Sequence, residues 1–268
     1  MPKFKTTIKF EKGSSEHLTL LEETLDYAPL NMIWVNPGSF LMGNLPNSPL
    51  SNPYADEKPF QVTLQNGFWL GKYPVTQYQW QVVMQTLPKQ PVNNPNCPVV
   101  DVSWYGAMAF CELLNEHYFH DLPQGYAFSL PTEAQWEYAC RAGTRTAFYN
   151  GDDMARLTDI AWYSGNSHGQ IQPVGQKQPN QWGFYDMLGN ISQWCYDLWG
   201  SYPQESKIDW VADNGYYDTP YRVIRGGEYN STLEMGSGLT CGARIELPVR
   251  GKTQIDGFRL TIRMVYNT

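Results

Sequence analysis

Apolar positions along the chain form short, scattered patterns rather than long regular ones. Segments that alternate, or that are rich in β-branched and aromatic residues, predict strands at 32–35, 61–64, 68–72, 221–225 and 257–263. The stretch 141–220 shows no period although it carries many aromatic residues, and loops of that length in a compact domain are normally functional or pinned by packing. The pattern predicts an α+β domain with a small antiparallel sheet, few helices and much ordered loop.

Three short helices are predicted from their first residues. Thr76 and Thr132 are each followed three residues later by a glutamine, the capping-box pattern that satisfies the unpaired amides of a first helical turn. Ser103 is suited to cap a third helix. The apolar residues that follow it fall on one helical face: Trp104, Ala107, Met108, Cys111 and Leu114.

Residues 1–30 differ in pattern from the rest of the chain. KFKTTIKF alternates as a strand does, and EHLTLLEETL has the spacing of a short amphipathic helix. We expect this segment to be an N-terminal extension packed on a main domain that covers residues 31–268. The main part has no fixed-period repeat and no low-complexity linker, so we predict one domain there.

Composition narrows the class of protein. The 268 residues carry 19 Lys and Arg against 26 Asp and Glu, and a net charge of −7 argues against a nucleic-acid-binding protein. No apolar run is long enough to span a bilayer, and the first 20 residues lack the apolar core of a signal peptide, so we expect a cytoplasmic protein. Five cysteines without a CxxC pair do not make a disulfide scaffold. The 23 glycines and 19 prolines, dispersed along the chain, exclude a helical bundle and a coiled coil.

Seven segments in a fixed order resemble the sulfatase-modifying-factor family, whose founding activity is formylglycine generation. They are WVNPGSFLMG, GFWLGKYPVTQYQW, PVVDVSWYGAMAFC, LPTEAQWEYACRAG, PNQWGFYDMLGNISQWC, RVIRGGEY and DGFRL, and they cover about residues 30–264. The resemblance implies a variant of the C-type lectin fold, with long ordered loops and often bound calcium. The family includes copper-dependent formylglycine-generating oxidases, iron-dependent sulfoxide synthases, pyoverdine-maturation enzymes and binding proteins diversified by retroelements, so the fold does not fix the function.

The residues that would carry the oxidase chemistry are replaced in this chain. The oxidases have two thiols after an Arg-Gly-Gly-Ser motif, because soft sulfur ligands hold Cu(I) and one thiol engages the substrate cysteine. In this chain, Ser231 and Gly236 occupy the two thiol positions, and Glu228 occupies the position of the serine that follows Gly-Gly. We therefore expect neither copper nor formylglycine-generating activity.

Histidines give little support for an iron site. The iron-dependent branch requires a His-x(3)-His-x-Glu cluster, and this chain has histidines only at 17, 117, 120 and 168. His117 and His120 are one helical turn apart, a spacing that a metal site can use, but no third ligand accompanies them. An exposed helix end is the favoured interpretation.

The resemblance implies a calcium site in the segment DMLGNISQW. Carried over by position, Asp186 and Gln193 would supply side-chain oxygens and Gly189 and Ile191 backbone carbonyls, a hard donor set that suits Ca²⁺. Gln193 stands where the family usually has glutamate, which removes one negative charge. The alternative is a hydrogen-bonded turn. The acid-rich stretch 209–218 lacks the spacing of an EF-hand, and a solvated loop is favoured there.

Other residues have roles that the resemblance suggests. Three arginines are expected to form ion pairs or carbonyl clamps beneath the loops: Arg225, Arg244 and Arg259. Three tryptophans are candidates for ligand stacking, although core packing is favoured: Trp182, Trp194 and Trp199. Cys140 and Cys241 fall on positions that pair as a disulfide in some extracellular members. Cys111 falls on another such position, and Leu260 occupies the position of its partner. Reduced, buried thiols are the favoured interpretation in a cytoplasmic protein, and a disulfide between Cys140 and Cys241 is the alternative.

Three functions remain open. The first is a non-catalytic binding protein, since the scaffold motifs are intact and the redox residues are missing. Its ligand, an unknown protein or small molecule, would contact the segment between RGG and GFR. We expect a monomer with no nucleic-acid or membrane partner. That segment presents Glu228, Tyr229, Asn230, Thr232, Leu233, Glu234, Met235, Ser237 and Leu239. The second is an oxidoreductase-like maturation enzyme with a non-thiol site and Glu228 as candidate base. The third is a regulatory or assembly module that binds another protein through residues 1–30.

Overall fold

The computed structural model describes residues 17–20, 30–45, 48–50, 58–118, 120–212, 220–234 and 238–265. The strand predicted in KFKTTIKF lies outside this part of the chain, as do Met235, Gly236 and Ser237. The helix predicted in EHLTLLEETL is wrong at His17–Leu20, because these residues pair with Leu30–Ile33 as an antiparallel strand. In chain order the elements are β1 (His17–Leu20), β2 (Leu30–Val35), β3 (Gly38–Met42), β4 (Phe60–Leu64), β5 (Phe68–Gly71), α1 (Gln77–Met84), α2 (Trp104–Tyr118), β6 (Tyr126–Ser129), α3 (Glu133–Arg141), the 3₁₀ helix η1 (Met154–Asp159), β7 (Ser192–Leu198), β8 (Lys207–Ile208), β9 (Tyr221–Arg225), β10 (Arg244–Pro248), β11 (Asp256–Gly257) and β12 (Thr261–Met264).

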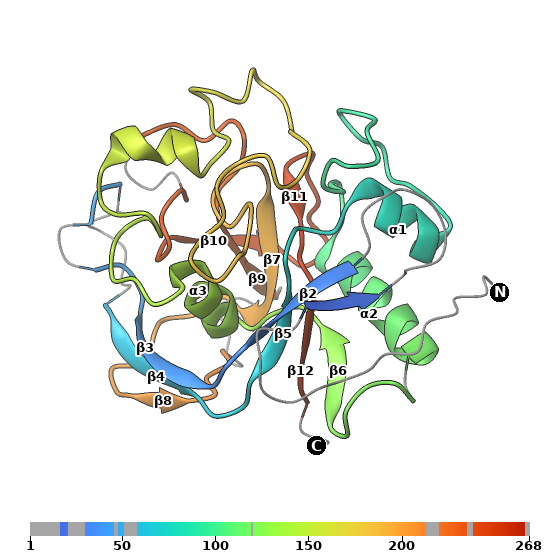
Figure 1. Ribbon diagram of the computed structural model, residues 1–268, viewed down its shortest axis with the longest axis horizontal. Helices are drawn as coiled ribbons and strands as arrows, with labels where there is room; N and C mark the ends of the chain where they lie inside the picture. The colour runs from blue at the N-terminus through green and yellow to red at the C-terminus, as the bar shows by residue number, and fades with distance from the viewer. Residues whose placement is uncertain are drawn as a thin grey trace.

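Three small sheets replace the single sheet that the sequence predicted. A five-stranded sheet has the order β1-β2-β5-β12-β6, a four-stranded sheet the order β10-β9-β7-β11, and a three-stranded sheet the order β3-β4-β8. Figure 1 shows α1 and α2 on one side of the molecule, β3, β4 and β8 on the other, and β7 between them. The result is the α+β, loop-rich architecture of the C-type lectin type that the sequence predicted.

Both predicted capping boxes form. The Thr76 hydroxyl accepts a hydrogen bond from the Gln79 amide, and the Gln79 side chain accepts one from the Thr76 amide. Thr132 and Gln135 exchange the same pair of bonds at the start of α3. At α2 the Ser103 hydroxyl accepts from the Gly106 amide 3.2 Å away. These caps begin their helices at the predicted residues because the contacts involved are local.

β7 is a strand that the sequence pattern did not reveal. It lies inside the stretch 141–220, and its side chains alternate between two buried clusters: Trp194 packs in one and Cys195 in the other. Because both faces are covered, the strand shows no alternation of apolar and polar residues. Trp194 is fully buried in one cluster, and Trp182 and Trp199 are partly buried against the other, which agrees with the packing interpretation of the three tryptophans.

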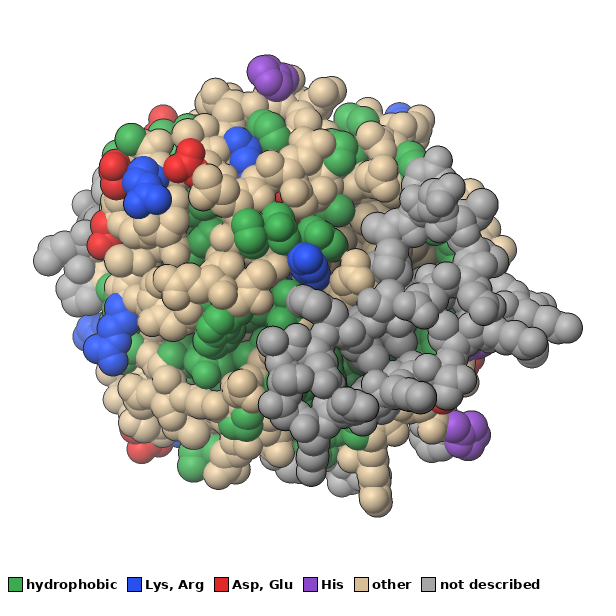
Figure 2. All heavy atoms as spheres, in the orientation of Figure 1, with side chains coloured by type: hydrophobic (Ala, Val, Ile, Leu, Met, Phe, Trp, Pro, Cys, Tyr) green, Lys and Arg blue, Asp and Glu red, His purple; other side chains and the backbone are tan. Residues whose placement is uncertain are grey.

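The face of the molecule seen in Figure 2 is sparsely charged. The face in Figure 2 shows hydrophobic side chains between a few scattered charged ones, as expected for a chain with only 17% charged residues. Within the described residues, no helix has both the length and the apolar character needed to cross a bilayer.

Candidate functional site

A buried network of charges lies beneath the Arg-Gly-Gly segment. Arg225, the last residue of β9, donates to the Glu137 carboxylate and to the carbonyl oxygens of Cys241 and Ala243, and its Nε lies 3.3 Å from Glu133 Oε1. Both glutamates belong to α3 and have fully buried side chains. The predicted ion pairs and carbonyl clamps of Arg225 are therefore present, and they join β9, α3 and the segment before β10.

Two further arginines complete the network. Arg141 Nε lies 2.8 Å from Glu137 Oε1, and Arg244 NH2 lies 2.7 Å from Glu133 Oε2. Burial by itself raises the pKa of Glu137, but the positive charges of Arg141 and Arg225 outweigh burial and hold that pKa below its ordinary value. Three guanidinium groups thus share two carboxylates in the interior, and Arg244 confirms the second of the predicted ion pairs.

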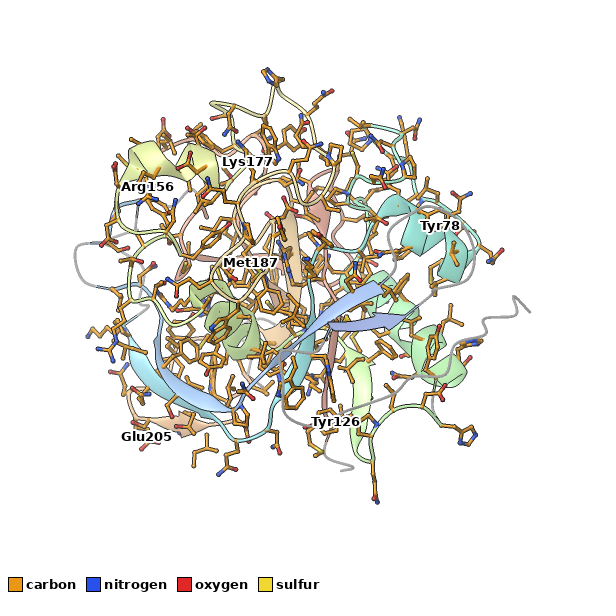
Figure 3. All side chains as sticks on the ribbon, viewed as in Figure 1. Tyr78, Tyr126, Arg156, Lys177, Met187 and Glu205 are labelled. Carbon is orange, nitrogen blue, oxygen red and sulfur yellow. The ribbon has the colours of Figure 1, made fainter. Side chains whose placement is uncertain are left out.

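Two glycines turn the chain from this network toward the surface. Gly226 and Gly227 have φ angles of 98° and 68°, the left-handed region that favours glycine. A Cβ on Gly226 would lie 2.8 Å from the carbonyl oxygen of Met187, a residue near the middle of the view in Figure 3. The RGG motif is therefore a backbone requirement, because only glycine fits this turn.

Beyond the glycines, the segment 228–234 (the recognition loop) is held by backbone hydrogen bonds. The Tyr229 amide donates to the Asn190 carbonyl at 3.0 Å. Within the loop, the Ser231 amide donates to the Glu228 carbonyl at 3.0 Å, and the Glu228 amide donates to the Ser231 hydroxyl at 3.1 Å. A fixed backbone under short polar side chains is the arrangement that binding loops use on rigid scaffolds.

The predicted contact residues do not all reach the surface. Asn230, Thr232, Leu233 and Glu234 are exposed, and Glu228 and Tyr229 are half-buried. Leu239 is fully buried in the larger core cluster, where it packs over Gly227, so its prediction as a ligand contact is wrong. Met235 and Ser237 lie outside the described residues.

Ser231, which occupies the first of the two oxidase thiol positions, does not present a reactive group. The Ser231 side chain is 7% exposed and its oxygen is held by the Glu228 amide. All five cysteines are buried free thiols, with Cys140 Sγ 3.5 Å from Cys241 Sγ and burial raising the pKa of Cys140. Cys111 and Leu260 are both buried in the other large cluster. Among the described residues, no group of three His, Cys, Asp or Glu side chains is placed to hold a metal ion.

His117 lies in the last turn of α2 and His120 lies just beyond the helix; both are exposed, which supports the interpretation of an exposed helix end. In the acid-rich stretch, residues 213–219 lie outside the described part, while the Asp209 carboxylate accepts a hydrogen bond from the Gln65 amide at 2.8 Å. Within the described residues, neither the histidine pair nor the acid-rich stretch brings together a set of metal ligands.

A carboxylic acid pair lies at the base of the recognition loop. Glu228 Oε2 accepts a hydrogen bond of 2.7 Å from the Ser192 hydroxyl, and burial raises the pKa of Glu228. Asp256 Oδ2 accepts one of 2.7 Å from the Thr253 hydroxyl; its pKa is raised to about 6, mainly by burial and further by the charge of Glu228. The two acids therefore influence each other, and Glu228 has the environment of a weak acid that holds its proton more tightly than usual.

Two of the four predicted calcium ligands, Gln193 and Gly189, have oxygens that already accept hydrogen bonds within the protein. Gln193 Oε1 accepts hydrogen bonds from Trp136 Nε1 at 3.0 Å and from Arg259 Nε at 2.6 Å, and Gln193 Nε2 donates to the Asp186 carbonyl at 2.7 Å. The Gly189 carbonyl accepts the Ile191 amide at 2.9 Å. An amide oxygen with two N–H donors has both lone pairs in use.

Arg259 supplies the positive charge at this place. Its fully buried guanidinium also donates to the carbonyl oxygens of Gly71 at 2.8 Å, Tyr185 at 2.8 Å and Asp186 at 2.9 Å. The third predicted carbonyl clamp is therefore present. Because Arg259 and Trp136 fill the Gln193 oxygen, this side chain does not fit a calcium ligand in this arrangement. The Asp186 carboxylate, the other predicted side-chain ligand, accepts a hydrogen bond from the Gly175 amide at 2.8 Å. These bonds favour the hydrogen-bonded turn, and the calcium site stays a prediction.

Asn190 is a structural residue that the sequence interpretation left without a role. It is fully buried with φ of 67°, and its side chain exchanges two hydrogen bonds of 3.0 Å with the backbone of Gln172. Its amide donates to the Trp162 carbonyl at 2.8 Å. The Gly-Asn pair was a signal for a special turn, since asparagine tolerates the left-handed region and bonds to nearby backbone.

Comparison with known proteins gives a consistent result. A structure of Treponema denticola variable protein 1 matches with a TM-score of 0.76 and 26% identity, covering 90% of this chain and 97% of that one. The chaperone protein LppX of Paenibacillus barcinonensis is 30% identical over 206 residues, 60% of this chain and 71% of the relative. The formylglycine-generating enzyme of Streptomyces coelicolor is 32% identical over 147 residues, which is 50% of this chain but only 43% of that enzyme. The model of the sulfatase-modifying factor enzyme 1-like domain matches residues 20–264, and the chain belongs to that family.

Proposed function

We propose that this chain is a non-catalytic binding protein of its family, and that its ligand contacts the recognition loop. The observation that carries the proposal is the contrast within one short segment. Arg225 is held in a buried network, whereas Asn230, Thr232, Leu233 and Glu234 are exposed a few residues later. Side chains on such a loop can be exchanged with little effect on folding, because surface substitutions usually change stability by less than about 0.5 kcal/mol.

The replaced thiols support a function without oxidase chemistry. A hydroxyl at Ser231 cannot bind Cu(I) as a thiolate does, and this hydroxyl is already a hydrogen-bond acceptor inside the loop. We expect no conversion of a sulfatase-type cysteine peptide to formylglycine, with or without copper, when the peptide is analysed by mass spectrometry. Turnover above a control without protein would contradict this part of the proposal.

The likeness to a protein named as variable supports a recognition loop that differs between copies of the gene. The genomic neighbourhood tests this directly. A reverse transcriptase gene close to a near-copy of codons 225–260 would support diversification by a retroelement. An isolated gene without such a copy would remove that part of the proposal and leave the binding loop itself untouched.

Glu228 gives specific support to a second candidate, an enzyme with a non-thiol site. Its half-buried carboxyl has a raised pKa and is bonded to the Ser192 hydroxyl, which are features of a general base. A base also needs a reacting group within hydrogen-bond reach, and the described contacts of Glu228 are the hydroxyls of two buried serines. The binding function is therefore the better supported of the two.

Photo-crosslinking tests the binding function. Benzoyl-phenylalanine replaces Leu233 in one sample and Met154 in a control; both side chains are exposed, at 40% and 42%, and Met154 lies in η1, away from the recognition loop in sequence. The full chain is irradiated in an extract of its source cells. We expect a defined adduct from position 233 that excess unlabelled chain prevents and that position 154 does not give. The absence of any such adduct would contradict the proposed function.

A further inference from the structure

A second loop lies directly beside the recognition loop. Residues 163–170 form a tight turn in which the amides of Asn166 and Ser167 both donate to the Tyr163 carbonyl, at 3.0 and 2.9 Å. The turn exposes Ser164, His168 and Gln170. His168 has a φ of 57°, unusual for a residue with a side chain, and Gly169 follows at 70°. Figure 1 shows the yellow segment that follows η1 reaching the upper edge of the molecule.

The two loops are joined through their backbones. The Ser164 amide donates to the Ser231 carbonyl at 3.0 Å. Asn190 connects both loops. Its carbonyl accepts a hydrogen bond from the Tyr229 amide, and its own amide donates to the carbonyl of the residue before the turn. Its side chain is hydrogen-bonded to the backbone of Gln172, just after the turn. Since Asn190 is fully buried, the two loops are held in a fixed relative position from below.

We infer that loops 163–170 and 228–234 form one composite surface that binds a folded protein through a basic patch on that protein. This inference rests on the proposed function and extends its site to a second loop and a class of partner.

The chemistry of the exposed side chains supports a protein partner. They combine short hydrogen-bonding groups with one exposed leucine: Ser164, His168, Gln170, Asn230, Thr232, Leu233 and Glu234. Serine, asparagine and glycine with a half-buried tyrosine beneath them are the groups that adaptable protein-binding loops use. Spread over two loops, these side chains are suited to a macromolecular surface, whereas small-molecule sites are concave and mostly apolar.

The charge of the two loops determines which sign of charge on the partner's surface would be attracted. Neither segment contains lysine or arginine, and 228–234 carries two glutamates, of which Glu234 is exposed. The whole chain has a net charge of −7. A basic patch on the partner would therefore be attracted, and an acidic patch repelled, as in other interfaces with complementary potentials.

The test extends the crosslinking experiment to the second loop. Benzoyl-phenylalanine is placed at His168, Leu233 or the control Met154 of the full chain, and adducts formed in an extract of the source cells are identified by peptide sequencing. We expect the same protein from positions 168 and 233 and not from 154, with competition by the unmodified chain but not by a chain carrying N230A and T232A. We also expect the yield to fall severalfold when salt rises from about 0.1 M to about 1 M, since the Debye length falls from about 10 Å to about 3 Å.

The outcomes separate this inference from the proposed function. An adduct from 233 but not from 168 overturns the composite surface and leaves the recognition loop as the binding site. An adduct from neither position overturns both. A small-molecule adduct in place of a protein, or a yield unaffected by salt, overturns the assignment of a basic protein partner. Thermal melts of each substituted chain show whether it is folded, so that a missing adduct is not mistaken for unfolding.

Discussion

The substitution Glu137→Gln tests whether the buried charges hold the recognition loop's scaffold together. Glu137 accepts hydrogen bonds from the Gly43 amide at 2.8 Å, from Arg141 at 2.8 Å and from Arg225. The network already has three guanidinium groups for two carboxylates. Removing one carboxylate leaves three buried positive charges against a single negative one, and glutamine keeps the size of the side chain but not its charge.

The expected cost is large because no water can replace the lost partner. Breaking a buried ion pair by removing one member costs about 3–5 kcal/mol. At roughly 2–4 °C of melting temperature per kcal/mol for a protein of this size, the midpoint should fall by about 6–20 °C. Urea unfolding followed by circular dichroism measures the free energy, and an unchanged slope would show that the folded and unfolded states keep their compactness.

Glu205→Gln is the matched control. The Glu205 carboxylate also pairs with a cation, Lys207, at 2.7 Å, but its side chain is 78% exposed and lies at the edge of the molecule (Figure 3). Exposed pairs contribute little because water and salt screen them, so its midpoint should stay that of the wild type. Equal stability of Glu137→Gln and wild type would refute the reasoning.

The same variant predicts a pH dependence. The folded-state pKa of Glu137 is lowered by Arg141 and Arg225 against the opposing effect of burial. A lowered pKa gives stability that is present above the unfolded value, about 4.3 for glutamate, and is lost as pH falls through the folded value. The difference between wild type and Glu137→Gln should therefore be largest near neutral pH and shrink in acid.

Three other predictions follow from the described contacts. Leu239→Ala should cost about 2–5 kcal/mol in urea unfolding, as for other buried leucines, whereas Leu233→Ala should cost less than about 0.5 kcal/mol; equal costs would contradict the assignment of one to the core and the other to the surface. Calcium and excess chelator should leave the melting temperature unchanged, because Arg259 already occupies the Gln193 oxygen; a rise that grows with calcium concentration would show a bound ion. Cys140 and Cys241 should resist iodoacetamide in the folded chain and react after unfolding without reductant; failure to react then would reveal a disulfide.

Local contacts were predictable from the sequence, and contacts between distant segments were not. The caps at Thr76 and Thr132 involve residues three positions apart, so their pattern is visible in the chain itself. Arg225 and Glu137 are 88 positions apart, and one sequence does not show which buried charges meet. The strand prediction at 257–263 joined parts of two separate strands, β11 and β12, because residues 258–260 between them include no glycine or proline to mark the break.

The recognition loop shows why a segment between two anchors is not uniformly exposed. The sequence interpretation placed nine residues between Glu228 and Leu239 at the surface, Leu239 among them, because the segment is polar, contains glycine and lies between the RGG and GFR motifs. A glycine creates the exception: Gly227 has no side chain, and the space beside its backbone is filled by Leu239, whose Cδ2 lies 3.1 Å from the place of the missing Cβ. Leu239 therefore closes the loop against the core.

The same geometry limits where such a loop can vary. Substitution of Gly226 would bring a Cβ to 2.8 Å from the Met187 carbonyl, and substitution of Arg225 would leave Glu137 with one cation fewer. Substitution of either residue would therefore lower the stability of the fold, whatever its effect on ligand binding. Within the described residues of the recognition loop, Asn230, Thr232, Leu233 and Glu234 have exposed side chains. We therefore expect exchange at these positions to change binding with little effect on stability, which depends on the buried network.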